Sequence, residues 1–469
     1  MVDDVVIMGA GPAGLAAGFE LLKKNCNALL FESQNQVGGI SKTVKYKDFY
    51  FDLGGHRFFT KLDEVNDLWH EVLKDDFQKV PRLSRIYYQN KYFNYPLTAM
   101  NALTGMGVMD TIGITSSYMY SKIFPCKCED TFEQWVSNRF GKKLYSMFFK
   151  TYTEKVWGIP CSQIQAEWAA QRIKGLSLKT AVINAVVKKN NTIKTLINEF
   201  DYPTYGPGMM YNRMKEHIEN MGGSVYMNST VDRVNKEGNE IKSIEYVDKH
   251  GARTSVEGRQ FISSIPVTEL VKKISPAPDT RVLKAADNLS YRSIITIDII
   301  LRKKDLFPDN WIYIHSPEVK LGRIQNFKNW SKKMIPTEDK TSLGLEYFCN
   351  ENDEFWNLPD NELFEIASNE IEKLNIAKKE DIEDYIVIKV PKAYPVYMNG
   401  YRSNIEIIEE YLKQIRNLQQ IGRYGLFKYN NMDHSVLTGL YAAKNIIEDR
   451  YKYDTWKVNT DSEYQEEKK

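Results

Sequence analysis

The chain has 469 residues, of which 42% are hydrophobic and 26% are charged, a balance typical of soluble globular proteins. This length exceeds the size at which a single hydrophobic core stops growing, so two or three domains are expected. The 63 basic and 61 acidic residues nearly cancel, and the basic residues are scattered along the chain, which argues against nucleic acid as a partner.

The N-terminal region has the order strand, glycine turn, helix, strand that opens a dinucleotide-binding βαβ unit. Val5–Met8 is an apolar strand, Gly11–Lys24 has helical spacing, and Ala28–Phe31 is a second apolar strand. Because Met1 leads directly into the first strand, neither a signal peptide nor a membrane anchor is expected there.

The middle of the chain predicts two further domains. Residues 93–199 are expected to form a mainly helical inserted domain, because Thr131–Phe149 and Ala166–Lys188 carry apolar residues at helical spacing. Residues 268–404 combine the helix Asp360–Leu374 with several strands, which predicts a substrate domain with an antiparallel sheet. The strands are Ser293–Leu301, Trp311–His315, Ser342–Phe348 and Tyr385–Val390.

The remaining segments return to the dinucleotide fold. Ser229–Val234 and Gln260–Ile265 have strand character, and the short strand Leu418–Gly422 precedes a last helix, His434–Asp449. The cofactor domain is therefore expected to be discontinuous. It is assigned residues 1–92, 200–267 and 405–456, and residues 457–469 are expected to form a polar tail.

The sequence Gly9-Ala10-Gly11-Pro12-Ala13-Gly14 lies where a dinucleotide needs it, after one strand and at the start of one helix. Gly9 permits a tight turn, Gly11 lets the backbone approach a pyrophosphate, and Gly14 lets helix and strand pack closely. The helix N-terminus presents free N–H groups and the positive end of its dipole to the phosphates. Glu32 ends the second strand, where its carboxylate can accept hydrogen bonds from ribose hydroxyls. Together these features favour a bound dinucleotide over a glycine-rich turn without a ligand.

Two features favour FAD, with NAD alone as the alternative. Gly38-Gly39-Ile40-Ser41 adds a second glycine pair, which suits a long dinucleotide whose flavin end continues into the protein. Val225–Val231 and Phe261–Pro266 resemble the strand pair that completes the cofactor domain of glutathione-reductase-like and amine-oxidase-like flavoproteins. The resemblance implies an α/β fold, with an FAD-binding Rossmann-like domain of the glutathione-reductase type beside the helical and sheet domains.

Several segments resemble UDP-galactopyranose mutase, a family within the superfamily of amine oxidases, protoporphyrinogen oxidases and desaturases. They are Asp52–His56, Lys155–Pro160 with Trp168 and Arg172 downstream, Gly322–Ile324 with Asn329–Ser331, and Gly422–Gly425 with Lys428, Tyr429 and Asp433–Ser435. The matches keep the order of the mutase and extend to about residue 450. Tyr202–Gly208 and Arg57 depart from the family pattern, so the sugar stays open.

The resemblance implies roles for individual residues. The implied catalytic residues are His56, Arg172 and Arg323, and the implied substrate-binding residues are Trp157, Arg172, Arg323, Tyr397 and Tyr429. FAD is expected at Gly9, Gly11, Pro12, Ala13, Gly14, Glu32, Ser33, Gly38, Gly39, Ile40, Ser41, Gly55, His56, Val231, Gly422, Arg423, Tyr429, Asp433, His434 and Ser435. Two arginines from different segments can hold a diphosphate with charge-assisted, bidentate hydrogen bonds, and the hydroxyls of Tyr397, Tyr424 and Tyr429 can add donors. Asp433 is expected to cap the last helix.

The mutase family implies isomerisation of a nucleotide sugar, UDP-linked in that family, between its pyranose and furanose forms. In this reaction N5 of reduced FAD attacks the anomeric carbon, and the product serves cell-surface polysaccharide synthesis. An FAD-dependent oxidoreductase of the amine oxidase or protoporphyrinogen oxidase type is the alternative, because it shares the fold. A binding protein like the guanine-nucleotide dissociation inhibitors is disfavoured by the intact Gly9–Gly14 turn and by Glu32.

The five cysteines are an odd and scattered set, which indicates the reducing cytoplasm rather than a disulfide framework. No run of eighteen apolar residues occurs, so membrane insertion is not expected. No metal site is expected, because Cys126 and Cys128 have no second pair or histidine cluster beside them. Whether the chain forms a homo-oligomer, and which reductant serves the flavin, are left open by the sequence.

Overall fold

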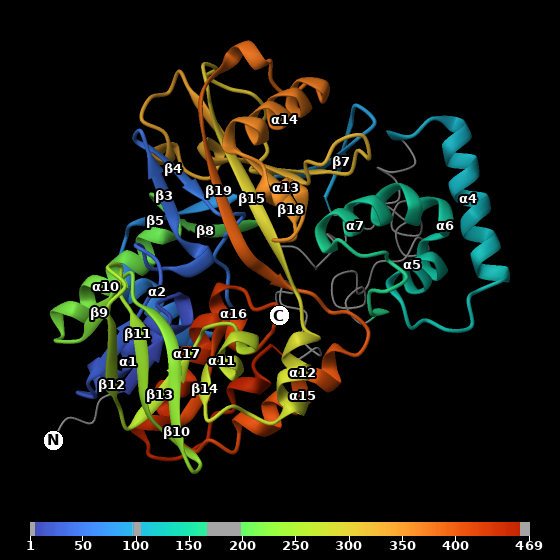
Figure 1. Cartoon of the computed structure of the whole chain (residues 1–469). Coiled ribbons are helices and arrows are strands. Elements are labelled where there is room, and N and C mark those ends of the chain that lie inside the picture. The colour runs from blue at the N-terminus through green and yellow to red at the C-terminus, as the bar shows by residue number, and fades with distance from the viewer. Residues whose placement is uncertain (1–4, 96, 98–104, 167–197, 460–469) are drawn as a thin grey trace.

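The computed structural model describes residues 5–95, 97, 105–166 and 198–459. A five-stranded, wholly parallel sheet carries the nucleotide-binding unit (Figure 1). Its order is β20 (Leu418–Gln420), β13 (Gln260–Ser263), β1 (Val5–Met8), β2 (Ala28–Phe31) and β9 (Ser224–Tyr226). The strands are short apolar runs because both faces of the sheet are covered. The expected mixed α/β class is confirmed.

Helices pack on one face of this sheet, and a smaller sheet with three helices packs on the other. The first layer consists of α1 (Pro12–Lys23), α2 (Asp63–Leu73), α10 (Gly208–Asn220) and α17 (Met432–Ile447). The second contains β10 (Thr230–Glu237), β11 (Glu240–Val247), β12 (Arg253–Glu257), β14 (Ile274–Ser275), α11 (Val267–Lys273), α12 (Thr280–Asp287) and α15 (Tyr401–Leu412). Residues 268–287 thus pack on the nucleotide-binding unit, although they were assigned to the substrate domain. Val271 and Val282 share a core with Phe261 of β13, a contact that the local sequence pattern does not reveal.

A seven-stranded sheet forms the second large unit. Its order is β19 (Ile382–Pro395), β15 (Tyr291–Leu301), β18 (Thr341–Cys349), β17 (Arg323–Asn326), β16 (Trp311–Ile314), β6 (Ser84–Tyr88) and β7 (Lys91–Asn94). All neighbours are antiparallel except β16 and β6. Helices α13 (Glu354–Asn357) and α14 (Asp360–Lys373) contribute to the core on one face. Residues 84–92 therefore belong to this sheet rather than to the expected cofactor segment 1–92, because β6 pairs with β16 far along the chain.

Two small antiparallel pairs connect these units, and a helical region follows β7 of the seven-stranded sheet (Figure 1). The pairs are β3 (Thr43–Tyr46) with β4 (Phe49–Asp52), and β5 (Phe77–Pro81) with β8 (Glu199–Pro203). The helices are α4 (Val108–Ile123), α5 (Phe132–Phe140), α6 (Lys142–Leu144), a π-helical turn Tyr145–Lys150, and α7 (Thr151–Trp157). The expected helix Thr131–Phe149 is interrupted at Gly141, which has a φ of +85°. The expected helix Ala166–Lys188 lies outside the described residues except for Ala166.

Among the residues that the structure describes, no helix is both long and apolar enough to cross a bilayer.

Asp52 ends β4 with a buried carboxyl group that accepts hydrogen bonds from the hydroxyls of Tyr202 and, at 2.7 Å, Thr43. Burial raises its pKa to about 7, and the two hydrogen bonds only partly oppose this rise. Between the unfolded pKa of 3.8 and this value, the folded protein holds a proton that the unfolded chain has lost. The free energy of unfolding should therefore fall as the pH rises from about 4 to 7.

Asp52→Asn removes this titration, so its free energy of unfolding should depend less on pH over that interval, by an amount on the order of 4 kcal/mol at most. Urea titrations of both proteins at pH 4.5, 6 and 7.5 measure the difference. Parallel pH profiles for the two proteins would mean that Asp52 titrates normally in the folded state.

Candidate functional site

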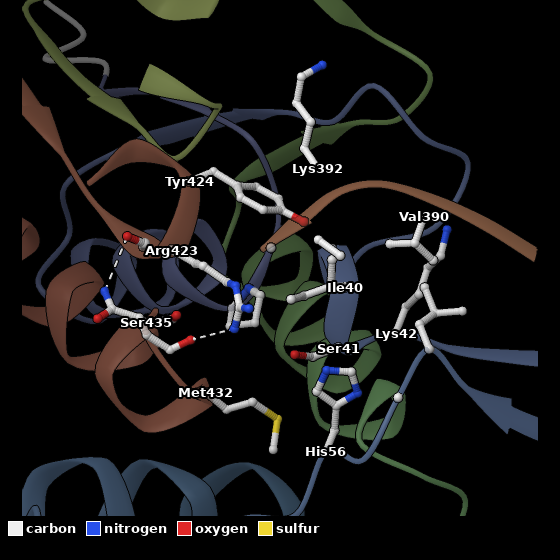
Figure 2. Close-up of a pocket in the computed structure, with 18 of the residues that line it drawn as sticks. Ile40, Ser41, Lys42, His56, Val390, Lys392, Arg423, Tyr424, Met432 and Ser435 are labelled. Carbon is white, nitrogen blue, oxygen red and sulfur yellow. Dashed lines mark hydrogen bonds between the residues drawn. The ribbon is translucent and has the colours of Figure 1, made fainter. Parts of the chain in front are cut away.

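A cavity of about 500 Å³ lies where the carboxyl ends of the parallel strands meet the seven-stranded sheet. One wall comes from the glycine turn, the end of β2 and the loop 39–42, and the opposite wall comes from β16, β17 and β19. The crevice at the carboxyl ends of an open parallel sheet is the usual place for a ligand in such folds. In Figure 2, Arg423, Tyr424 and His56 extend into the same central space, with Ile40 and Ser41 beside it.

The nucleotide end of the cavity is built from backbone groups. Gly9 has a φ of +100°, and a Cβ there would lie 2.3 Å from the Ser264 hydroxyl oxygen, so only glycine fits this turn. The Glu32 carboxylate is fixed by two backbone amides, since it accepts from Ala10 N–H at 2.9 Å and from Gln34 N–H at 3.0 Å. Oε1 also accepts from the Ser33 hydroxyl at 3.3 Å, whereas Oε2 accepts only from Ala10 among the described residues and retains a lone pair to which a ribose hydroxyl can donate.

The first turn of α1 faces a second tight turn. Gly11 precedes this helix without a side-chain cap and Pro12 is its first residue, so the amides of the first turn are available to an anion. Gly38 donates its N–H to the Ala10 carbonyl at 2.9 Å, which brings the turn Gly39–Ser41 (η1) opposite the helix N-terminus. This cradle of glycines and free amides fits a pyrophosphate.

The cavity also gathers a neutral imidazole and two guanidinium groups. Burial lowers the pKa of His56 to about 3, and the charges of Arg423 and Arg323 add to this effect, so the ring is uncharged. Arg423 donates one hydrogen bond to the Asn430 carbonyl at 3.2 Å and lies over the Tyr429 ring, 4.3 Å from its centroid. Its buried Nε and Nη2 have no hydrogen-bond partner among the described residues. Such orphaned donors fit an acceptor-rich ligand such as the isoalloxazine or a phosphate.

Arg323 lines the cavity and forms an ion pair with the fully buried Glu346. Its Nε donates to the Glu346 carboxylate at 2.9 Å, and Nη2 donates to the same oxygen. Gln325 donates to the other Glu346 oxygen at 2.7 Å. Burial opposes the charge on Arg323, but the Glu346 carboxylate outweighs it and raises the pKa of Arg323 well above its ordinary value. The guanidinium therefore stays charged, and its Nη1 takes no part in this ion pair.

Two of the expected substrate-binding residues lie behind the cavity wall. Trp157 is buried, and its ring lies 6.2 Å from Tyr394 and 6.3 Å from Tyr429, measured between ring centroids. The Tyr397 hydroxyl accepts a hydrogen bond from the Tyr429 N–H at 2.7 Å. Trp157 and Tyr397 thus support Tyr429 instead of lining the cavity. Arg172, expected in both the catalytic and the substrate-binding sets, lies outside the described residues.

Most residues expected at the cofactor line the cavity. These are Gly9, Gly11, Pro12, Ala13, Glu32, Ser33, Gly39, Ile40, Ser41, Gly55, His56, Val231, Gly422, Arg423, Tyr429, Asp433 and Ser435. Arg323 lines it as well, whereas Gly14, Gly38 and His434 are not part of the lining.

The last helix begins differently from the expectation. Asn431 is the N-cap of α17, and His434 Nδ1 accepts from the Asn431 N–H at 3.4 Å. Asp433 lies inside the first turn instead, so the prediction that it caps the helix is wrong. Burial raises the pKa of this carboxyl group. The helix begins earlier than expected because Asn431 is itself a favoured capping residue.

The cavity wall contributed by the seven-stranded sheet could not be predicted from the sequence. Tyr394 of β19 stacks on Tyr429 with ring centroids 5.5 Å apart and lines the cavity beside Trp311, Tyr313 and Gln325. A β-bulge at Lys392, with a φ of +54°, directs this part of β19 toward the cavity. The alternation of side chains along β19 could have indicated that Tyr394 faces the cavity. The residues beside it in the cavity wall, however, come from segments that are distant in the sequence.

The lining is basic although the whole chain is nearly neutral. It contains seven lysines and arginines against three acids. The basic residues are Lys42, Arg57, Lys273, Arg323, Lys389, Lys392 and Arg423, and the acids are Glu32, Glu269 and Asp433. This surplus of positive charge favours anionic ligands.

The family model described as flavin containing amine oxidoreductase matches residues 12–447. A probable flavin-containing monoamine oxidase A of Dictyostelium discoideum is 31% identical over 105 residues, covering 19% of this chain and 23% of that protein. A 4,4'-diapophytoene desaturase of Methylomonas sp is 32% identical over 85 residues, covering 18% of this chain and 16% of that protein. The alignments thus span less than a quarter of the length of these curated relatives.

Two solved structures resemble the whole chain. A reduced UDP-galactopyranose mutase has a TM-score of 0.85 at 22% identity, covering 98% of this chain and 99% of that one. A putative protoporphyrinogen oxidase from Exiguobacterium sp. 255-15 has a TM-score of 0.71 at 15% identity, covering 96% of this chain and 98% of that one. At these identities the likeness concerns the fold.

Proposed function

Because this chain belongs to the flavin-containing amine oxidoreductases and uses FAD, we propose that it is a nucleotide-sugar mutase of the UDP-galactopyranose mutase type. The proposed reaction interconverts the pyranose and furanose forms of a UDP-linked sugar for a cell-surface polysaccharide. The unpaired cysteines among the described residues support the reducing cytoplasm as its compartment.

The observation that carries this proposal is the pair of guanidinium groups beside His56. The charges of Arg323 and Arg423 both lower the pKa of this imidazole, and all three side chains line the cavity. Seven basic residues line the cavity, and with Glu346 behind Arg323 four acidic residues face them, which leaves a surplus of three positive charges. Two pyrophosphates, one in FAD and one in the nucleotide sugar, would be attracted by this surplus. An amine substrate is a cation at neutral pH and would meet repulsion there.

The residues of the chain have separate tasks in this proposal. Arg323 and Arg423 bind the diphosphate and stabilise the charge that develops as it leaves the sugar. Glu346 accepts hydrogen bonds from Nε and Nη2 of Arg323 and so holds this guanidinium group in one orientation. The uncharged His56 can exchange one hydrogen bond with a sugar hydroxyl without adding charge. Reduced FAD supplies the nucleophile of the reaction when it is bound.

The proposal is tested with the whole protein reduced by dithionite. UDP-galactopyranose and a panel of other nucleotide sugars are added, and chromatography is used to look for a furanose product. Product should form with reduced protein and be absent with oxidised protein. The lack of a furanose from every sugar tested would contradict the proposal.

An FAD-dependent oxidoreductase is the second candidate. It is favoured by the aromatic part of the lining, which contains the stacked Tyr394 and Tyr429 as well as Trp311 and Trp330. Aromatic and apolar walls suit an uncharged amine or a porphyrinogen. Turnover of such a compound by the oxidised protein, together with no mutase product, would favour this candidate.

Arg172 carries a prediction that rests on its position downstream of Trp157 in the mutase-like segment. Arg172→Ala should weaken UDP binding by roughly 2–4 kcal/mol, because it removes a charge-assisted contact to a buried anion. Titration calorimetry with UDP measures the loss, and flavin absorbance should stay at the wild-type level. Unchanged UDP affinity would remove Arg172 from the proposed site.

A further inference from the structure

The connection between β16 and β17, residues 315–322, joins two residues of the cavity wall. Tyr313 lines the cavity near the end of β16, and Arg323 lines it as the first residue of β17. The two residues are paired across these antiparallel strands. The place of the Arg323 backbone in the cavity wall therefore depends on how the connection is held.

Lys155 of α7 binds both ends of this connection. Its ammonium group donates hydrogen bonds to the carbonyls of Ile314 at 3.3 Å, Ser316 at 2.7 Å and Leu321 at 3.0 Å. These three acceptors match the three N–H groups that a charged lysine carries. Leu321 is separated from Arg323 by a single residue, so this lysine acts on the backbone that leads directly into β17.

Two further contacts bind the same connection. Glu370 of α14 accepts from the N–H groups of Lys320 at 2.7 Å and Leu321 at 2.9 Å. Tyr152 of α7 stacks on His315, with ring centroids 4.7 Å apart and an angle of 7° between the planes. Each of these contacts binds one end of the connection, whereas the hydrogen bonds of Lys155 join the two ends to each other.

Helix α7 is itself fixed to the seven-stranded sheet, where it lies beside β18 (Figure 1). Arg292 of β15 donates to the carbonyls of Val156 at 3.2 Å and Lys155 at 3.3 Å, at the C-terminus of α7. It also donates to the Phe348 carbonyl of β18 at 2.9 Å. A Cβ at Gly158 would lie 2.5 Å from the Arg292 guanidinium carbon, so this approach requires glycine. Lys155 therefore extends from a helix whose end is held in place.

The charge of Lys155 is costly to keep in this position. Burial lowers the pKa of Lys155 to about 8, although the charges of Glu370 and Glu318 oppose the fall. A buried ammonium group destabilises a fold unless hydrogen bonds compensate, as the three carbonyls do here. Methionine has a similar length and could pack α7 against the sheet without this cost. Packing alone thus does not account for a lysine.

We infer that Lys155 is a positioning residue, which fixes the backbone of Arg323 where its guanidinium group meets the diphosphate. This inference rests on the proposed function of the same site. Glu346 orients the Arg323 side chain, and Lys155 holds the chain from which this side chain extends. Hydrogen bonds from a guanidinium group to phosphate depend steeply on geometry, so both supports are needed.

Titration calorimetry of the FAD-loaded protein with UDP tests the inference. Lys155→Met should weaken UDP binding roughly 10-fold, because a small displacement of Arg323 weakens its contacts to the phosphates. Lys155→Arg keeps the charge and the donors and should restore most of the affinity. Lys150→Met is the matched control, because Lys150 is exposed in the turn before α7, and it should bind UDP as the wild type does. Unchanged affinity in Lys155→Met would overturn the inference.

A double-mutant cycle separates positioning of Arg323 from general support of the fold. When Arg323→Met/Glu346→Gln is already present, adding Lys155→Met should change UDP affinity by less than about 2-fold. When Arg423→Met is present instead, the loss of roughly 10-fold should remain. Equal losses in the two backgrounds would mean that Lys155 does not act through Arg323.

Hydrogen exchange in the FAD-loaded protein without UDP tests the same support independently of the ligand. The amides of residues 314–323 should exchange faster in Lys155→Met than in the wild type and in Lys150→Met. If the methionine variant does not fold, Lys155→Gln, which keeps two N–H donors, takes its place. Unchanged exchange would overturn the inference. A wild type that does not bind UDP would contradict the proposed function, and exchange alone would then decide whether Lys155 fixes the backbone of Arg323.

Discussion

Alanine at Gly14 is expected to prevent the nucleotide-binding unit from folding, whereas alanine at Gly11 should leave the fold intact and weaken FAD binding. A Cβ at Gly14 would lie 1.9 Å from the Gly9 carbonyl oxygen, a backbone atom that cannot move aside. The cost should be about 3 kcal/mol or more. At Gly11 the nearest atom to such a Cβ is 3.9 Å away, and the φ of −76° suits alanine.

The Gly11 methyl group would instead occupy space that the pyrophosphate needs. FAD affinity should fall roughly 10- to 100-fold, or about 1.4–2.8 kcal/mol. Thermal unfolding of the apoprotein and FAD titration by flavin fluorescence separate the two effects. Gly107→Ala is the control, because a Cβ there meets nothing within 4 Å and its φ is −69°. Normal FAD affinity in Gly11→Ala would show that the cofactor does not bind at this turn.

Replacing Glu346 by glutamine should destabilise the protein by about 3–5 kcal/mol, because it leaves the buried charge of Arg323 without a partner. Glu346 is fully buried, and the Arg323 side chain is only 16% exposed. The double variant Arg323→Met/Glu346→Gln removes both charges and should recover most of the stability. Urea unfolding of the three proteins measures these differences.

The same set of variants tests whether Arg323 faces the substrate. In Glu346→Gln no carboxylate neutralises the guanidinium group of Arg323, so UDP should bind more tightly. Added UDP should therefore raise the urea midpoint of unfolding more than it does in the wild type. In the double variant this rise should be smaller than in the wild type. Equal shifts in all three proteins would mean that Arg323 has a structural role and does not contact the diphosphate.

The parts of the fold whose conformation depends on residues close in sequence could be predicted. Val5–Met8 and Ala28–Phe31 are the observed strands β1 and β2, because an apolar run between turn residues has few alternatives. The glycine turn was assigned correctly as well, since its φ value at Gly9 and its close contacts require glycine.

The residues that the sequence did not reveal at the site depend on pairing between distant segments. Tyr394 reaches the cavity because β19 pairs with β15, and Glu346 reaches Arg323 because β18 pairs with β17. A tryptophan in a helix, such as Trp157, is as compatible with a core position as with a ligand, and only tertiary packing decides between them. The same holds for β6 and β7, which were not predicted as strands and which join their sheet because β6 pairs with β16.

The order of strands in the parallel sheet also determines when the protein can assemble on the ribosome. β1 emerges first, yet it lies at the centre of the sheet, where Val5 pairs with Ala28 on one side and Gln260 on the other. The edge strand β20 and the helix α17 that packs on α1 are translated much later. The nascent N-terminal segment must therefore wait for most of the polypeptide, and such long-range topology folds slowly and exposes apolar surface meanwhile. Chaperones, and free flavin available once β20 and α17 have been made, should thus govern the yield of folded protein.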